Sequence, residues 1–251
     1  MKPLFLSLLL SVFFISAFTQ DVPVLMKEAD NFEKQLKEPE ALEKYKQVIT
    51  LQPANLKALV KAAEMNAIIS NRQQDNNTKR LYIESAYAFA KRAYAADSMQ
   101  ADACYAMAMA SGKMTETETE KKKLVAYVRD TKTYADKALA INPDHARANY
   151  TLGRWHYEMA NLSGIKKAAV KLLYGGLPEG SLEEAEKYME KCRALEPYFA
   201  PNYLVLAKAY KDDHKPAQAL EVLNKLVKLP VRSSDDSAAK AEGSVLLAGM
   251  Q

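Results

Sequence analysis

The sequence predicts an all-α protein built from repeated pairs of helices, and three observations support this fold class. The chain is rich in Ala, Leu, Lys and Glu but contains 8 Gly and 10 Pro among 251 residues, a composition that favours helix over a turn-rich β fold. Apolar residues recur at helical spacing. A similar stretch of sequence also returns near the end of five helical segments. The net charge of +4 lacks the basic excess of a nucleic-acid-binding protein.

Residues 1–20 are predicted to be a signal peptide for export rather than part of the fold. A lysine at the start precedes an apolar run at 4–18, and small residues follow at cleavage positions. A membrane anchor is the alternative, but the run is shorter than the roughly 20 residues that a spanning helix requires. Neither Cys104 nor Cys192 stands where a lipid would be attached. We therefore expect a periplasmic or secreted product that is soluble, is not a lipoprotein and has buried thiols.

The remaining chain repeats one helix–turn–helix pattern. Each unit ends in an amphipathic stretch followed by a helix breaker, usually proline. These stretches are YKQVITLQPAN (45–55), AKRAYAADSMQ (90–100), ADKALAINPDH (135–145), MEKCRALEPYF (189–199) and LNKLVKLPV (223–231). The alternation is typical of the tetratricopeptide repeat (TPR), a helix pair of about 34 residues. We expect a superhelical solenoid of about five units, at 22–55, 56–100, 101–145, 146–199 and 200–233, with a C-terminal capping helix at 234–251.

The first and last units carry the packing residues of this repeat most regularly. Small residues let the two helices of a pair approach closely, and larger ones interlock between turns. In the first unit these residues are Leu25, Ala29, Phe32, Ala41, Tyr45 and Val48, and in the last they are Tyr203, Leu206, Ala207, Tyr210, Ala219, Leu223 and Leu226.

The three middle units are longer than the standard repeat. In the second unit the polar stretch at 70–80 predicts a surface loop. In the third, the stretch at 115–123 predicts a solvated extension of the following helix. The fourth insertion predicts a short amphipathic helix within 162–178. This candidate lid consists of Ile165, Lys166, Lys167, Ala169, Lys171 and Leu172. It either covers the concave groove of the solenoid and completes its core, or contacts a partner or a lipid headgroup layer.

Candidate binding residues follow from the helical phase of the first helix in each unit, which lines the concave side of a TPR solenoid. They are Tyr105, Met109, Arg147, Tyr150, Arg154, Tyr157, Lys208 and Lys211. Aromatic rings beside basic groups suit an acidic peptide or an anionic amphiphile. The alternative is a groove filled by the chain itself, and we expect Arg154 to form an ion pair with a carboxylate on a neighbouring helix.

The sequence contains no constellation that indicates catalysis. His145, His156 and His214 have no cysteine or carboxylate at metal-ligand spacing. A nucleophile elbow and a phosphate-binding glycine loop are also missing. We therefore expect no enzymatic activity, metal or cofactor.

Two adjoining segments carry a resemblance to a known family. They are LGRWHYEMANLSGIKKAAVKLLYGGLPEGSLEEAEKYMEKCRALEP (152–197) and NYLVLAKAYKDDHKPAQALEVLNKLVKLPVRSSDDSAAKAE (202–242). The sequence resembles the regulator of microtubule dynamics family over about 55–245. The resemblance implies a TPR-like helical protein without catalytic chemistry, associated with microtubules, organelle contacts or, in one branch, lipid. An exported chain would not meet cytosolic tubulin, so we do not expect tubulin as a partner.

Two functional hypotheses follow from the sequence. The first is an exported, non-catalytic scaffold that binds a protein or peptide. The second is a carrier that encloses a lipid or another amphiphile in the concave groove beneath residues 162–178. Neither hypothesis involves nucleic acid or a transmembrane segment in the mature chain.

Overall fold

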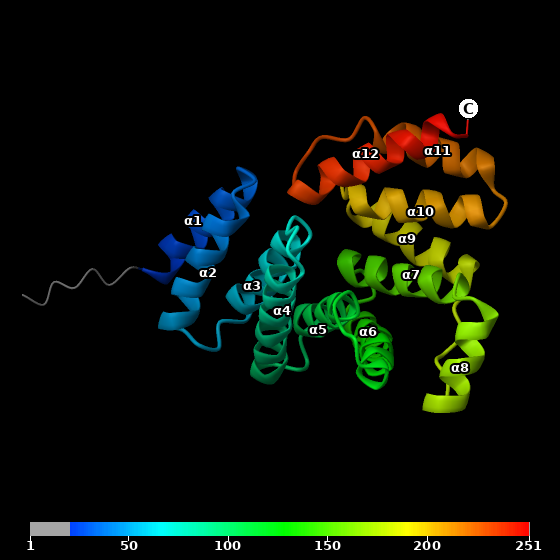
Figure 1. Ribbon diagram of the computed structural model, residues 1–251. Coiled ribbons are helices and arrows are strands. Elements are labelled where there is room, and N and C mark those ends of the chain that lie inside the picture. Colours follow the sequence, from blue (N-terminus) through cyan, green and yellow to red (C-terminus); the bar gives the residue numbers. More distant parts are fainter. Residues whose placement is uncertain (1–20, 251) are drawn as a thin grey trace, which may run out of the picture.

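The computed structural model describes residues 21–250, and this part of the chain consists of α-helices joined by short loops (Figure 1). The predicted signal peptide at 1–20 lies outside the described residues. The helices are α1 (Val22–Lys34), α2 (Glu38–Leu51), α3 (Leu56–Ser70), α4 (Asn76–Ala96), α5 (Ala101–Met114), α6 (Lys121–Ile141), α7 (Ala146–Ala160), α8 (Gly164–Tyr174), α9 (Leu182–Leu195), α10 (Ala200–Asp212), α11 (Pro216–Leu226) and α12 (Ser234–Ala248). The predicted all-α fold class is confirmed.

The helices pack as successive pairs: α1 with α2, α3 with α4, α5 with α6, α7 with α9, and α10 with α11. Close approach within a pair depends on small residues. A Cβ atom added at Gly153 of α7 would lie 2.7 Å from Met189 Cγ and 3.0 Å from the Ala185 carbonyl oxygen of α9. Glycine therefore lets the backbone of α7 approach both the backbone and the Met189 side chain of α9.

The core runs along the solenoid between the paired helices. It is built mainly from alanine and medium-sized apolar residues, with Tyr45 and Tyr203 as the largest fully buried side chains. The single proton of the Tyr45 hydroxyl is shared between Asp30 Oδ1, at 2.8 Å, and Glu33. Because a buried hydroxyl requires a partner, these acidic residues of α1 determine where the tyrosine of α2 packs.

The predicted surface loop at 70–80 was too long. Only 71–75 joins α3 to α4. The side chain of Asp75 accepts a hydrogen bond of 2.7 Å from the Thr78 backbone N–H and thereby caps α4. The polar residues that follow form the exposed first turn of a 21-residue helix. In the third unit, α6 likewise begins only at Lys121, so the acidic part of 115–123 precedes the helix.

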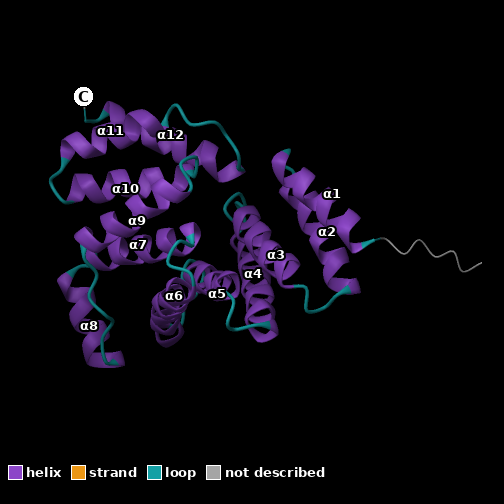
Figure 2. Ribbon diagram, turned by 180° about the vertical axis from the view of Figure 1, so that it is seen from behind, coloured by secondary structure: helices purple, strands orange, loops and turns teal. Residues whose placement is uncertain are grey.

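The superhelix curls until its last helix meets its beginning, as the two opposite views show (Figures 1 and 2). Ser234, at the start of α12, donates hydrogen bonds from its backbone N–H (3.2 Å) and hydroxyl (2.6 Å) to Glu38 at the start of α2. Asn71, after α3, donates to both carboxylate oxygens of Asp235 at 3.0 Å. These contacts close the arc into a ring.

Candidate binding site on the concave face

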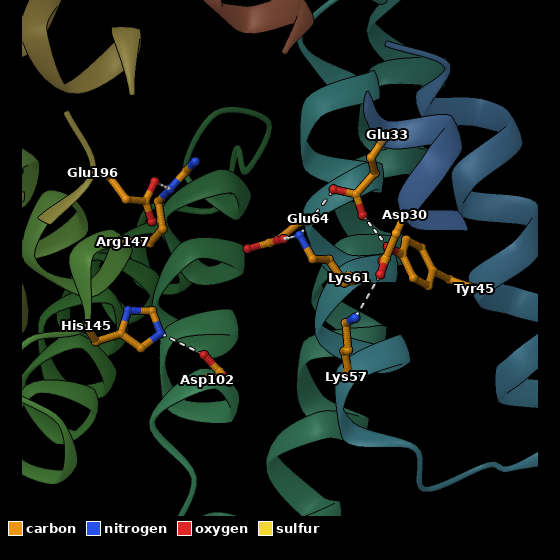
Figure 3. A network of polar contacts seen from close by, with 10 residues as sticks. All are labelled: Asp30, Glu33, Tyr45, Lys57, Lys61, Glu64, Asp102, His145, Arg147 and Glu196. Carbon is orange, nitrogen blue, oxygen red and sulfur yellow. Dashed lines mark hydrogen bonds and ion pairs between the residues drawn. The ribbon is translucent and has the colours of Figure 1, made fainter. Parts of the chain in front are cut away.

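The first helices of the middle and last pairs, α3, α5, α7 and α10, form the inner wall of the arc. Each contacts the next along the chain: α3 with α5, α5 with α7, and α7 with α10. We call the side chains that these helices turn toward the interior the concave face. Figure 3 shows polar residues of α3, α5 and α7 directed toward one another across this wall.

Arg147 is the best anchored cation on the concave face. Its Nε donates to Glu196 Oε2 at 2.6 Å, and its guanidinium carbon lies 3.5 Å from the centre of the Phe199 ring. Tyr150, one turn along α7, packs edge-on against the same ring. A guanidinium stacked on an aromatic face and held by a carboxylate has a fixed orientation. This cluster therefore presents a preformed surface rather than a flexible arginine.

An acidic group lies opposite Arg147 on α3. Burial raises the pKa of Glu64, but the positive charges of Lys61 and Arg147 outweigh this effect and lower the pKa overall. Lys61 Nζ lies 3.0 Å from Glu64 and 3.2 Å from Glu33 of α1 (Figure 3). The ionic network thus runs from α1 through α3 toward α7, and Glu64 remains ionised at neutral pH.

His145 joins the inner helices by capping one and bonding another. Its Nδ1 accepts a hydrogen bond of 3.1 Å from the Ala148 backbone N–H at the start of α7. The proton must therefore reside on Nε2, which lies 3.0 Å from Asp102 Oδ1 of α5. The hydrogen bond from His145 lowers the pKa of Asp102. The role of this histidine is structural.

The structure divides seven of the eight predicted groove residues into three groups. Tyr105 is buried, Met109 and Tyr150 are half-buried, and these three line the inner wall with Arg147. Tyr157 donates a hydrogen bond of 3.0 Å to Asp212, and Lys208 lies 2.6 Å from Glu242 of α12. Lys211 is exposed.

Arg154 differs from the expectation. Its nearest ion-pair partner is Glu158, on the same helix at 3.8 Å, and 47% of its side chain is exposed. Arg154 therefore pairs weakly within its own helix, and not with a carboxylate on a neighbouring helix as we expected. The positive charge of Arg154 is consequently available to solvent on the concave face.

A cavity of about 280 Å³ opens between the inner wall and the start of α12. Arg147, Phe199 and Arg232 line it, and the guanidinium carbon of Arg232 lies 3.9 Å from the centre of the Tyr198 ring. Among the described residues, no carboxylate forms an ion pair with Arg232. The cavity thus combines two arginine–aromatic stacks, and one of its cations has no acidic partner within 21–250.

The predicted lid does not cover this site. Lys166, Lys167, Ala169, Lys171 and Leu172 are exposed on α8, which lies at an outer corner of the molecule beside α6 (Figure 1). Ile165 belongs to α8, and its side chain is not described. After α8, the segment 175–181 returns to the solenoid, where Gly180 packs closely against His156 and Met159 of α7.

The sequence patterns did not identify several residues of the site. Lys61 and Glu64 occur on α3 in the phase that identified Arg147 and Tyr150 on α7, so applying that phase to the second unit would have found them. Glu196, Phe199 and Arg232 stand in turns, where helical periodicity gives no signal. Their roles depend on how neighbouring units stack.

The chemistry open to the described residues is limited in two respects. Within 21–250, no three histidine, cysteine or carboxylate side chains are grouped so that they could hold a metal ion. No helix in the same range has the length and apolar character needed to cross a membrane.

A superhelix of helix pairs with a charged, aromatic inner wall places this chain in the class of TPR-like solenoid proteins. A thermophilic TPR protein from Thermus thermophilus has the same fold, with a TM-score of 0.61 and 14% identity over 92% of this chain and 98% of that one. PilF of Pseudomonas aeruginosa matches with a TM-score of 0.52 and 12% identity over 91% of each chain. At such identities the likeness concerns the fold alone.

The chain belongs to the regulator of microtubule dynamics protein 1-3 family, whose sequence model matches residues 25–251. Regulator of microtubule dynamics protein 1 of Bos taurus is 27% identical over 68% of this chain and 54% of its own length. Regulator of microtubule dynamics protein 3 of Xenopus laevis is 35% identical over 42% of this chain and 23% of its own length. The chain thus spans about half or less of these relatives. The resemblance noted in the sequence is confirmed.

Proposed function

We propose that the protein is an exported, non-catalytic scaffold that binds an acidic segment of a protein partner on its concave face. The supporting observation is a surplus of available cations. Arg147, Lys61 and Lys208 are paired with carboxylates, whereas Arg154 has a weak pair with Glu158 and a hydrogen bond with Tyr150, and Lys211 is exposed. Because the paired residues are held in place, an acidic segment would meet a preformed surface with unsatisfied positive charge.

The aromatic residues favour a peptide over a simple anion. Phe199 and Tyr150 form a T-shaped pair beside Arg147, and Tyr198 lies under Arg232. Aromatic groups at a rigid surface are typical anchors of protein interfaces. A segment with carboxylates flanking an apolar residue would place charge on the two arginines and an apolar group against the rings.

Export is part of the proposal and rests on residues 1–20. It would place the concave face in a periplasmic or extracellular compartment. The relatives' names refer to microtubule dynamics, and a chain outside the cytosol would act on other partners. Expression with and without residues 1–20, followed by cell fractionation, tests this point. The proposal requires the full chain to be exported and shortened, and the truncated chain to stay in the cytosol.

Crosslinking and pull-down from the native compartment test the binding function. The double variant Arg154→Glu/Lys211→Glu should lose partners that the wild type captures, because it reverses the charges of the two exposed predicted groove residues. A matched control, Lys122→Glu/Lys228→Glu, makes the same change in net charge at exposed positions outside that face. Equal capture by both variants would contradict the assignment.

Native mass spectrometry of the purified protein separates the scaffold from a carrier. A mass equal to the bare chain agrees with the scaffold. A stoichiometric amphiphile that stays bound and is lost in Arg154→Glu/Lys211→Glu would overturn the scaffold in favour of a carrier.

A further inference from the structure

Helix α8 has its own start and stop signals and makes few contacts with the solenoid. The Ser163 hydroxyl accepts a hydrogen bond of 3.4 Å from the Lys166 backbone N–H at its start. Gly175 ends the helix in the left-handed region at φ 76°, where glycine is favoured. Its contacts with the rest of the fold run mainly to α6, where Arg129 Nη2 donates to the Gly176 carbonyl oxygen at 2.6 Å. Helix α8 is therefore a defined element, and the hydrophobic core does not depend on it.

The apolar side of α8 faces solvent. At about 100° per residue, Ala169, Leu172 and Leu173 share one side of the helix, and Val170 lies on another. Val170 is half-buried, whereas Leu172 is 85% exposed and Leu173 is 62% exposed. An amphipathic helix on a globular protein normally turns its apolar stripe inward. Here Leu172 and Leu173 of the stripe are exposed, and α8 occupies a corner that projects beyond α6 and α7 (Figures 1 and 2).

The charge on this segment has one sign. Residues 159–178 contain Lys166, Lys167 and Lys171 and no acidic residue. Lys167 Nζ lies 3.4 Å from the Ala160 carbonyl oxygen, and none of the three lysines forms an ion pair with a described residue. Lys166 is seven positions before Leu173, so it borders the apolar stripe. The exposed surface thus combines leucines with cations that have no acidic partner among the described residues.

We propose that α8 docks the protein on an anionic lipid surface. Leu172, Leu173 and Ala169 would enter the boundary between headgroups and acyl chains, and the lysines would lie against lipid phosphates. The lysines complement anionic lipid headgroups, and the exposed apolar stripe suits the acyl boundary. The projecting corner can also reach a flat surface without displacing other helices. One helix of 11 residues gives weak, reversible attachment. The docking surface is separate from the concave face, so both could be occupied together.

Vesicle flotation tests the docking surface. The chain from residue 21 is suitable, because every contact described lies within 21–250 and the apolar run at 4–18 would itself bind lipid. We expect it to float with vesicles of equal parts phosphatidylglycerol and phosphatidylcholine, and not with phosphatidylcholine alone. Leu172→Ser/Leu173→Ser should lower the partition coefficient about tenfold by removing apolar area. Lys166→Glu/Lys171→Glu should lower it at least about tenfold by reversing charge.

Matched controls separate α8 from general surface effects. Lys27→Glu/Lys34→Glu makes the same charge change on α1, and Leu81→Ser removes a leucine that is 63% exposed on α4. Both should bind as the wild type does. Circular dichroism should show the same melting temperature for the α8 variants, because the substituted side chains are exposed.

Three results would overturn the proposal: no flotation of the wild type with anionic vesicles, equal loss in the α1 control, or α8 variants that bind as well as the wild type. Light scattering adds a fourth. A wild-type dimer that Leu172→Ser/Leu173→Ser converts to a monomer would show that a second copy of the chain covers the apolar stripe instead.

Discussion

One buried carboxylate, Glu38, provides one of the two contacts that close the ring, and replacing it should weaken the closure. Glu38 is 3% exposed and accepts hydrogen bonds from the Ser234 backbone N–H, the Ser234 hydroxyl and, at 3.1 Å, Arg72 Nη1. Glu38→Gln keeps the shape and one acceptor but removes the charge. Hydrogen bonds to charged groups contribute about 1.5–3 kcal/mol each to stability. We expect a loss of about 2 kcal/mol, because the glutamine amide oxygen retains part of the bonding.

The pH dependence of this contact has a defined sign. Burial by itself raises the pKa of Glu38, but hydrogen bonds from Ser234 and Arg72 outweigh it, so the pKa lies below its ordinary value. A carboxyl with a depressed folded-state pKa stabilises the fold above its unfolded pKa of about 4.3. That contribution is lost as the pH falls through the folded value. The difference between wild type and Glu38→Gln should therefore be full at pH 7 and shrink below about pH 4.

Thermal unfolding and small-angle X-ray scattering measure the two consequences. A loss of about 2 kcal/mol corresponds to a fall of roughly 4–8 °C in melting temperature for a chain of this size. The radius of gyration should rise as α12 separates from α2. Glu40→Gln is the matched control, since Glu40 is exposed on the same helix. If Glu38→Gln and Glu40→Gln melt and scatter alike at pH 7, the ring is not held by this carboxylate.

Three further substitutions test the remaining contacts. Gly153→Ala should destabilise the protein by about 1–3 kcal/mol in urea unfolding, because its Cβ would meet Met189 at 2.7 Å. Gly164→Ala is the control, because a Cβ there has nothing within 4 Å. Equal effects of the two variants would contradict close packing of α7 on α9. Arg154→Ala should change stability by less than about 1 kcal/mol, since its pair with Glu158 is exposed and long, and a larger loss in a thermal melt would reveal an internal role. Tyr45→Phe should lower the stability by about 1–2 kcal/mol in the same urea assay, because Asp30 and Glu33 lose a buried donor. An unchanged stability would mean that Lys57 and Lys61 satisfy both carboxylates.

The local features of the fold could be read from the sequence. Apolar spacing indicated the helix pairs, and breakers such as Pro53 and Pro143 stand in the turns between them. The family resemblance was carried by residues of α7 to α12. The phase of α7 also placed Arg147 and Tyr150 on the inner wall. These features depend on neighbours a few residues apart, which is the range over which helical periodicity operates.

The tertiary structure alone decided how the units curl and which surfaces stay open. Glu38 and Ser234 are 196 residues apart, so their contact results from small rotations accumulated over every intervening unit. The same accumulation brings Phe199 and Arg232 beside the inner wall from two turns. The pattern of α8 showed an apolar stripe but not its direction. Helical spacing shows that these apolar residues share one side of α8, and only the position of α8 beside α6 leaves Leu172 exposed.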